Sequence, residues 1–156
     1  MFYGEYEHTL DRKGRLIIPS KLREVAQAHY VEKFYITRGL DKCLFVFTEE
    51  EWRLQEAKYR ALPFTKSATR SFTRLYFSGA SEVTCDKQGR ILMPKVLKDF
   101  AGIKRDVVIL GVSNHIEVWA KEAWKEFYES SKETFEEVAD RLIEGPSQES
   151  QPHEGK

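Results

Sequence analysis

The chain has 156 residues, of which 41% are hydrophobic and 32% are charged, and its formal net charge at pH 7 is zero. This length fits one ordinary domain or two very small ones. No apolar run approaches the ~20 residues that a membrane helix needs, and the N-terminus does not resemble a signal peptide. Cys43 and Cys85 match neither a metal-ligand spacing nor a disulfide framework, so we expect a reduced, cytoplasmic protein.

The charges are distributed unevenly along the chain. Residues 1–116 contain 20 lysines and arginines against 14 aspartates and glutamates, whereas residues 117–156 contain 5 against 11. A basic first part followed by an acidic segment can present a local positive surface although the whole chain is neutral. The charge balance therefore does not exclude a nucleic-acid partner.

The first predicted element is a strand at residues 6–10, where polar and apolar residues alternate. The segment DRKGRLIIP follows directly. Asp11 and Gly14 are typical of a tight turn, because Asp accepts backbone hydrogen bonds and Gly adopts the left-handed conformation. We expect residues 16–18 to return beside residues 6–10 as the second strand of a hairpin. In that strand Arg15 faces away from the core.

A short helix, two strands and a longer helix complete the first unit. Pro19 suits the first turn of the short helix. The longer helix begins with the capping-box pair Thr48 and Glu51. The two strands are expected at residues 34–37 and 44–47. The short helix should bury Leu22, Val25 and Ala26, and the longer helix should bury Trp52, Tyr59 and Leu62.

The same order of elements then recurs. The segment DKQGRILMP at 86–94 repeats DRKGRLIIP of 11–19 at an offset of 75 positions. From Gly39 onward the two copies match at an offset of 72, as in the pairs Gly39 and Gly111 and Trp52 and Trp124. The connecting helix should bury Ala68, Phe72 and Leu75. The final helix carries Trp124, Phe127, Phe135, Val138 and Leu142, which we assign to the core or a subunit interface.

One such unit is too small to bury much surface alone, but two units packed face to face can share a core. We therefore predict an α+β fold in which two tandem units form an intramolecular pseudo-dimer with a β-barrel-like centre and peripheral helices. The predicted divisions are 5–47 and 77–120 for the units, 48–76 for the helical connection, 121–144 for the C-terminal helix and 145–156 for a disordered tail.

The repeated turn carries the candidate site. The requirements of a tight turn explain the Asp and the Gly. We expect no need in folding for the arginine that follows the Gly. Because both copies nevertheless have it, as Arg15 and Arg90, the arginine suggests a binding role. A two-stranded ribbon fits the DNA major groove, where Arg can bind guanine with two hydrogen bonds, and Lys can hold phosphates. The candidate DNA-binding residues are Arg12, Lys13, Arg15, Lys87 and Arg90, the turn-forming residues are Asp11, Gly14, Asp86 and Gly89, and Lys21, Arg23, Lys95 and Lys98 extend the patch.

These motifs resemble a known family. The pattern T-x-D-x-x-G-R-[LI]-x-[IM]-P-x-x-L is similar to that of the AbrB/SpoVT-type DNA-binding unit. Two copies in one short chain, each followed by a helix bearing Trp, with RSFTRLYFSGA between them and F-x-G-E-Y-x-H-T-L-D at the N-terminus, resemble the MraZ family over about residues 1–144.

The resemblance implies a swapped-hairpin, double-psi-like barrel made of two AbrB-like units. It also implies a nucleoid-associated bacterial transcriptional regulator, expected to be a repressor, that forms a ring-shaped homo-oligomer. Such a regulator binds short direct repeats of double-stranded DNA upstream of its own cell-division and cell-wall operon. The D-x-x-G-R hairpins, with Arg15 and Arg90, would make the DNA contacts.

Two other functions compete with this interpretation. For an enzyme, the sequence lacks the H-E-x-x-H, G-x-S-x-G and phosphate-loop motifs, and its four histidines are scattered. We expect no catalysis, cofactor, metal or small-molecule substrate. A non-catalytic oligomeric protein-interaction module, using the aromatic helices or the acidic segment 117–144, stays open. A substitution of Arg15 should leave the function of such a module unchanged, whereas the same substitution should abolish DNA binding by a regulator.

Overall fold

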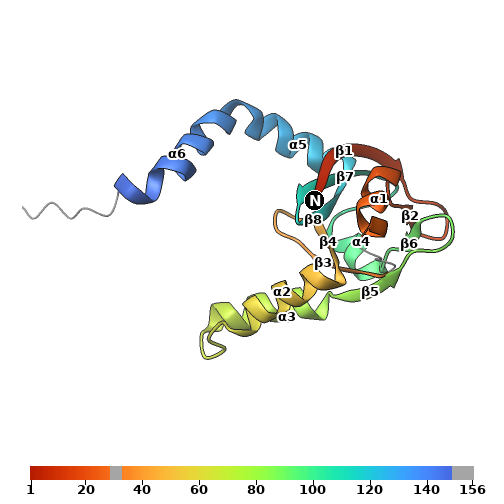
Figure 1. Cartoon of the computed structure of the whole chain (residues 1–156), viewed down its shortest axis with the longest axis horizontal. Coiled ribbons are helices and arrows are strands. Elements are labelled where there is room, and N and C mark those ends of the chain that lie inside the picture. The colour runs from red at the N-terminus through yellow and green to blue at the C-terminus, as the bar shows by residue number, and fades with distance from the viewer. Residues whose placement is uncertain (29–32, 149–156) are drawn as a thin grey trace, which may run out of the picture. The chain divides into compact units, whose positions relative to one another are not determined.

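The computed structural model in Figure 1 describes residues 1–28 and 33–148. The chain divides into two compact units, Met1–Lys121 and Glu122–Lys156, and each is described by itself. The fold combines helices with antiparallel sheets, which confirms the predicted α+β class. No helix in the described ranges is long and apolar enough to cross a membrane.

The first compact unit, Met1–Lys121, contains both copies of the D-x-x-G-R motif and two sheets. The larger has six strands in the order β1-β7-β8-β4-β3-β5, and the smaller consists of β2 and β6. Neither sheet closes into a barrel within the described residues. The strands are β1 (Phe2–Thr9), β2 (Arg15–Ile17), β3 (Lys33–Arg38), β4 (Leu44–Thr48), β5 (Ser81–Thr84), β6 (Arg90–Leu92), β7 (Asp106–Ser113) and β8 (His115–Ala120).

Helices follow each successive pair of strands. They are α1 (Ser20–Ala28), α2 (Glu49–Arg60), α3 (Ser67–Ser78), α4 (Lys95–Phe100), α5 (Lys121–Ser131) and α6 (Phe135–Gln148), with a 3₁₀ turn at Lys132–Thr134. Helix α2 begins at the predicted cap, where the Thr48 hydroxyl accepts a hydrogen bond from the Glu51 amide at 3.3 Å. Pro19 lies just before α1 rather than inside its first turn, because its carbonyl accepts the first helical amide bonds.

The two halves of the large sheet exchange their first strands. Strand β1 pairs with β7 of the second half, and β5 pairs with β3 of the first half. The prediction that residues 16–18 return beside residues 6–10 is therefore wrong, since β2 pairs with β6 instead. Alternation of polar and apolar residues indicates which face of a strand is buried, but it does not identify the neighbouring strand.

The strand register relates the two halves by an approximate two-fold axis. Leu16 pairs with Ile91, which lies 75 positions later and is its equivalent in the sequence repeat. Phe45 pairs with Glu117, its equivalent at the second offset of 72. A residue that pairs with its own equivalent lies on a two-fold axis. The halves are thus related as the two subunits of a dimer would be.

The core draws on both halves. Leu16 and Ile91 are 0% and 1% exposed, and they cover the inner face of the β2–β6 ribbon. Their outward neighbours Ile17 and Leu92 are 42% and 60% exposed. The ribbon therefore has one face in the core and one in solvent, as the alternation at Arg15 predicted.

An aromatic cluster joins α2 to α3. Trp52 stacks on Tyr76 with ring centroids 5.6 Å apart, and Phe72 lies 5.3 Å from Tyr76. The predicted connecting helix is present as α3. The prediction that this helix buries Leu75 is wrong, because Leu75 is exposed. The buried face follows the aromatic residues that pack on Trp52. Ala68 and Leu62 are also exposed.

The second unit consists of α5 and α6. The predicted apolar residues lie on these helices, but Phe135 and Leu142 are 74% and 73% exposed in the single chain. Helix α6 ends at Gln148, so it includes the first residues of the segment expected to be a tail. Residues 149–156 of that segment lie outside the described residues.

The ribbon gives a direct test of the shared core. We expect Leu16→Ala to lower the free energy of unfolding by about 2–5 kcal/mol, because it leaves a cavity where the two halves meet. Ile17→Ala, on the solvent face of the same strand, should cost less than about 1 kcal/mol. Urea unfolding followed by circular dichroism measures both. Equal losses would contradict the burial of one face only.

Candidate nucleic-acid interface

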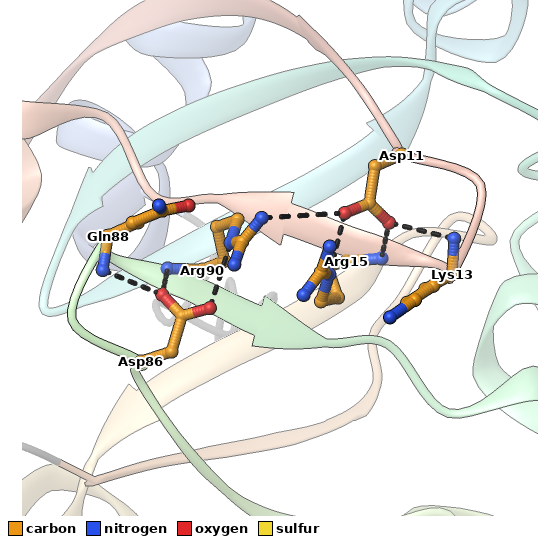
Figure 2. Close-up of polar contacts among 6 residues, drawn as sticks. All are labelled: Asp11, Lys13, Arg15, Asp86, Gln88 and Arg90. Carbon is orange, nitrogen blue, oxygen red and sulfur yellow. Dashed lines mark hydrogen bonds and ion pairs between the residues drawn. The ribbon is translucent and has the colours of Figure 1, made fainter.

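A carboxylate clamp holds the first repeated turn. Asp11 Oδ1 accepts the backbone N–H groups of Lys13 at 2.9 Å and of Arg15 at 2.8 Å, and Oδ2 accepts Arg15 Nε at 2.6 Å (Figure 2). Gly14 closes the turn with a φ of 78° and donates its N–H to the Asp11 carbonyl at 3.0 Å. The Asp, the Gly and the Arg of the motif are thus all used by the turn itself.

The second turn repeats the same clamp. Asp86 Oδ1 accepts the N–H groups of Gln88 and Arg90, both at 2.9 Å, and Oδ2 accepts Arg90 Nε at 2.8 Å. Gly89 has a φ of 77°, and a side chain there would also meet the Arg23 guanidinium. Only glycine fits this position without strain.

The two arginines lie side by side on the solvent face of the ribbon, between the two turns (Figure 2). Arg90 Nη1 also approaches Asp11 Oδ2 of the other turn at 3.9 Å. The sequence analysis missed this structural use, which itself explains why both copies retain the arginine. Each clamp to its own Asp takes only the Nε donor, and a guanidinium has five donors. A structural role and a binding role are therefore compatible in one side chain.

The clamp keeps both carboxylates ionised. The backbone amide of Arg15 lowers the pKa of Asp11 below its ordinary value of 3.8, and the Arg15 guanidinium adds to the effect. The backbone amide and guanidinium of Arg90 do the same for the pKa of Asp86. A charged acceptor forms stronger hydrogen bonds than a neutral one, so both turns hold their shape near neutral pH.

The other predicted cations lie at the turn tips and on the helices that follow. Arg12, Lys13 and Lys87 are exposed at the tips, at the two ends of the ribbon. Lys21 and Lys95 are also exposed. Arg23 differs, because its Nε donates to the Ile18 carbonyl at 2.9 Å, which gives it a role in holding the chain after β2.

A basic hollow beside the first turn is the part of the surface that sequence reasoning missed. Its cationic lining residues are Arg12, Arg15, Arg90, Lys98, Lys104 and Arg105. Asp11 is the one acid among the described residues that line it. The adjacent cations Lys104 and Arg105 were visible in the sequence. Only the exchange of strands, however, brings the loop before β7 next to β1 and the first turn.

The cysteine thiols and the metal-ligating residue types are weaker candidates for a site. Burial raises the pKa of the Cys43 and Cys85 thiols, and a neutral buried thiol is a poor nucleophile. In the ranges that the structure describes, no three His, Cys, Asp or Glu side chains are placed to hold a metal ion. The ribbon surface is therefore the strongest candidate site.

Comparison with known proteins agrees with the internal repeat. A family model described as "MraZ protein, putative antitoxin-like" matches the chain twice, over residues 1–75 and 76–145. The two matches together span nearly the whole chain, and each contains one D-x-x-G-R turn.

The clamp should make stability depend on pH in a defined direction. A carboxyl whose pKa is lowered by folding stabilises the protein above its unfolded pKa of about 3.9, and this stabilisation is lost as the pH falls through the folded value. We therefore expect the variant Asp11→Asn/Asp86→Asn to unfold at lower urea than the wild type above about pH 5. The difference should shrink as the pH falls below about 4.

Urea midpoints measured across this pH range test the expectation, and carbon-detected NMR titration of the two carboxyl groups checks it independently. A constant difference between the variant and the wild type down to about pH 2 would show that the carboxylate charges do not hold the turns.

Proposed function

Because the chain belongs to the MraZ family of non-catalytic, DNA-binding transcriptional regulators of a cell-division and cell-wall gene cluster, we propose that it binds short direct repeats upstream of its own operon and represses that operon. The observation that carries the proposal is the solvent face of the β2–β6 ribbon. Two arginines lie there between two rigid turns with exposed cations. A regulator of this kind acts at the nucleoid in the cytoplasm.

The ribbon suits the major groove in shape and in chemistry. The groove is about 12 Å wide and admits a two-stranded antiparallel ribbon. Arg15 and Arg90 keep donors beyond Nε for base edges, and the clamps fix their direction before DNA arrives. Arg12, Lys13 and Lys87 at the tips would contact base edges or phosphates. Preformed turns lower the entropic cost of binding.

The proposed fold follows from the exchanged strands. We infer that the two sheets, neither of which closes by itself within the described residues, together form a swapped-hairpin, double-psi-like barrel of two AbrB-like units, with unit boundaries near 5–47 and 77–120. The pairings of β1 with β7, of β5 with β3 and of β2 with β6 support this assignment. Segment 48–76 connects the units. Segment 121–144, predicted as one C-terminal helix, follows them and is divided into α5, a 3₁₀ turn and the first part of α6.

A ring-shaped homo-oligomer is part of the proposal. Each bidentate base contact provides roughly 1–3 kcal/mol, which is weak against the many competing sites of a genome. Several chains on successive repeats would add their contacts. Helix α6 supports such an assembly, because Phe135, Leu142 and Ile143 are each more than 70% exposed in the single chain, and large exposed apolar patches mark interaction surfaces.

Arg15 provides the test of DNA reading. We expect Arg15→Ala to lower the affinity for the operon's own upstream DNA by about tenfold or more, since one bidentate contact is lost. Asp11→Ala removes the whole carboxylate clamp, including the bonds from the Lys13 and Arg15 amides, but it keeps the guanidinium, so it should weaken binding less. Fluorescence anisotropy with a labelled duplex measures both, and circular dichroism checks the fold of each variant.

The matched control is Arg74→Ala, which removes one positive charge from α3, away from the ribbon. It should bind as the wild type does. If Arg15→Ala and Asp11→Ala weaken binding equally, Arg15 acts only through its turn. If the wild type ignores DNA altogether, the protein-interaction module becomes the better function.

The apolar face of α6 provides the test of assembly. We expect the wild type to form a multi-chain particle in native mass spectrometry. Phe135→Glu/Leu142→Glu should release smaller species, because the charges must be desolvated at the contact. Glu137→Gln/Glu144→Gln, on the side of the same helix opposite Phe135 and Leu142, should leave the mass unchanged. A wild type that is monomeric at all concentrations would overturn the ring.

A further inference from the structure

The basic hollow beside the first turn carries an inference that rests on the proposed DNA-binding function and extends it. We propose that Lys98, Lys104 and Arg105, together with Arg12, form a phosphate-binding site that binds the DNA backbone next to the first turn. The site would separate two tasks. The ribbon arginines read base edges, whereas Lys98, Lys104 and Arg105 hold a phosphodiester and set the register of the ribbon on the duplex.

The site is built from both halves of the chain. Arg12 belongs to the first turn, whereas the other three cations come from α4 and the loop before β7. The Leu10 amide donates to the Arg105 carbonyl at 2.9 Å, and the pairing of β1 with β7 continues to Thr9 and Asp106. The loop that carries Lys104 and Arg105 is therefore fixed against the strand that leads into the first turn.

Arg15 and Arg90 are paired with the turn carboxylates, but the other four cations of the hollow are not neutralised by an ion pair among the described residues. Asp11, the one acid among the described lining residues, already accepts hydrogen bonds from the first turn through both oxygens. Within residues 1–28 and 33–148, no carboxylate forms an ion pair with Arg12, Lys98, Lys104 or Arg105. Clustered cations without a partner repel one another, and an anion in the hollow relieves that repulsion.

The residue types favour a phosphate over a base edge. A lysine ammonium is a compact point charge that suits a phosphate but lacks the planar fork for two-point base recognition. Lys104 and Arg105 are exposed, so they can reach a backbone that passes the end of the ribbon. Anionic DNA already positioned by the first turn would bring a phosphate to this end.

The sequence makes this site specific to the first turn. The register pairs Thr9 with Asp106 and its equivalent Thr84 with Lys33. At the offset of 72 the equivalents of Lys104 and Arg105 are Glu32 and Lys33, and Lys33 is already paired with Glu82 at 2.9 Å. The two turns therefore differ in backbone-binding charge, and the first turn should contribute more of the salt-dependent affinity.

The test compares two duplexes of equal length and composition, one from the operon's own upstream region and one scrambled. We expect Lys104→Ala/Arg105→Ala to lower the affinity for both by the same factor, so the ratio between them stays constant. The slope of log affinity against log salt should become shallower by about one to two, because about 0.9 is lost for each phosphate contact. Anisotropy over a salt series gives all three quantities.

The matched control is Lys58→Ala/Arg74→Ala, which removes one lysine and one arginine from the α2–α3 hairpin and should change none of these quantities. Circular dichroism verifies the fold of each variant, and Lys104→Gln/Arg105→Gln replaces the alanine variant if that one is unfolded. NMR titration with inorganic phosphate separates a DNA backbone from a free phosphate as the ligand.

The outcomes separate the two proposals. A wild type that binds neither duplex overturns the proposed function and this site with it. A wild type that binds, with a hollow variant equal to the control, overturns the site alone. If Lys104→Ala/Arg105→Ala removes the preference for the upstream duplex, the hollow reads base edges and does not only hold a phosphate, which overturns the site as proposed. Loss of inorganic phosphate binding with DNA affinity unchanged would assign the hollow to a free phosphate.

Discussion

The pairing of β2 with β6 across the two halves is the constraint on which the rest of the structure depends. It buries Leu16 and Ile91 on the axis that relates the halves. Because the side chains of a strand alternate, the same pairing places Arg15 and Arg90 together in solvent. One short antiparallel ribbon thus closes the shared core on one side and creates the candidate interface on the other.

The Asp–Arg clamps change how the repeated motif should be understood. An arginine after a turn glycine resembles a residue retained purely for binding, yet Arg15 and Arg90 first hold their own turns. A side chain fixed in this way loses little freedom when it meets a ligand. Structural and binding roles are therefore two uses of one guanidinium.

Much of the fold could be predicted because its signals are local. The turns at Asp11 and Asp86, the cap at Thr48 and the outward direction of Arg15 each depend on a few neighbouring residues. Strand partners were not predictable in this way, because β1 and β2 are adjacent in sequence but pair with strands of the other half. The hollow was missed for the same reason, since Lys104 meets the first turn only through that exchange.

The helical connection through α2 and α3 has a consequence for the DNA that such a protein can address. Two identical chains related by a true two-fold axis read palindromes, because any change in one subunit is copied in the other. Here the halves are covalently joined, so Arg12 and Lys13 in one turn could diverge from Lys87 and Gln88 in the other. Unequal turns give the molecule a direction along the duplex, and directional readers suit operators whose repeats run head to tail.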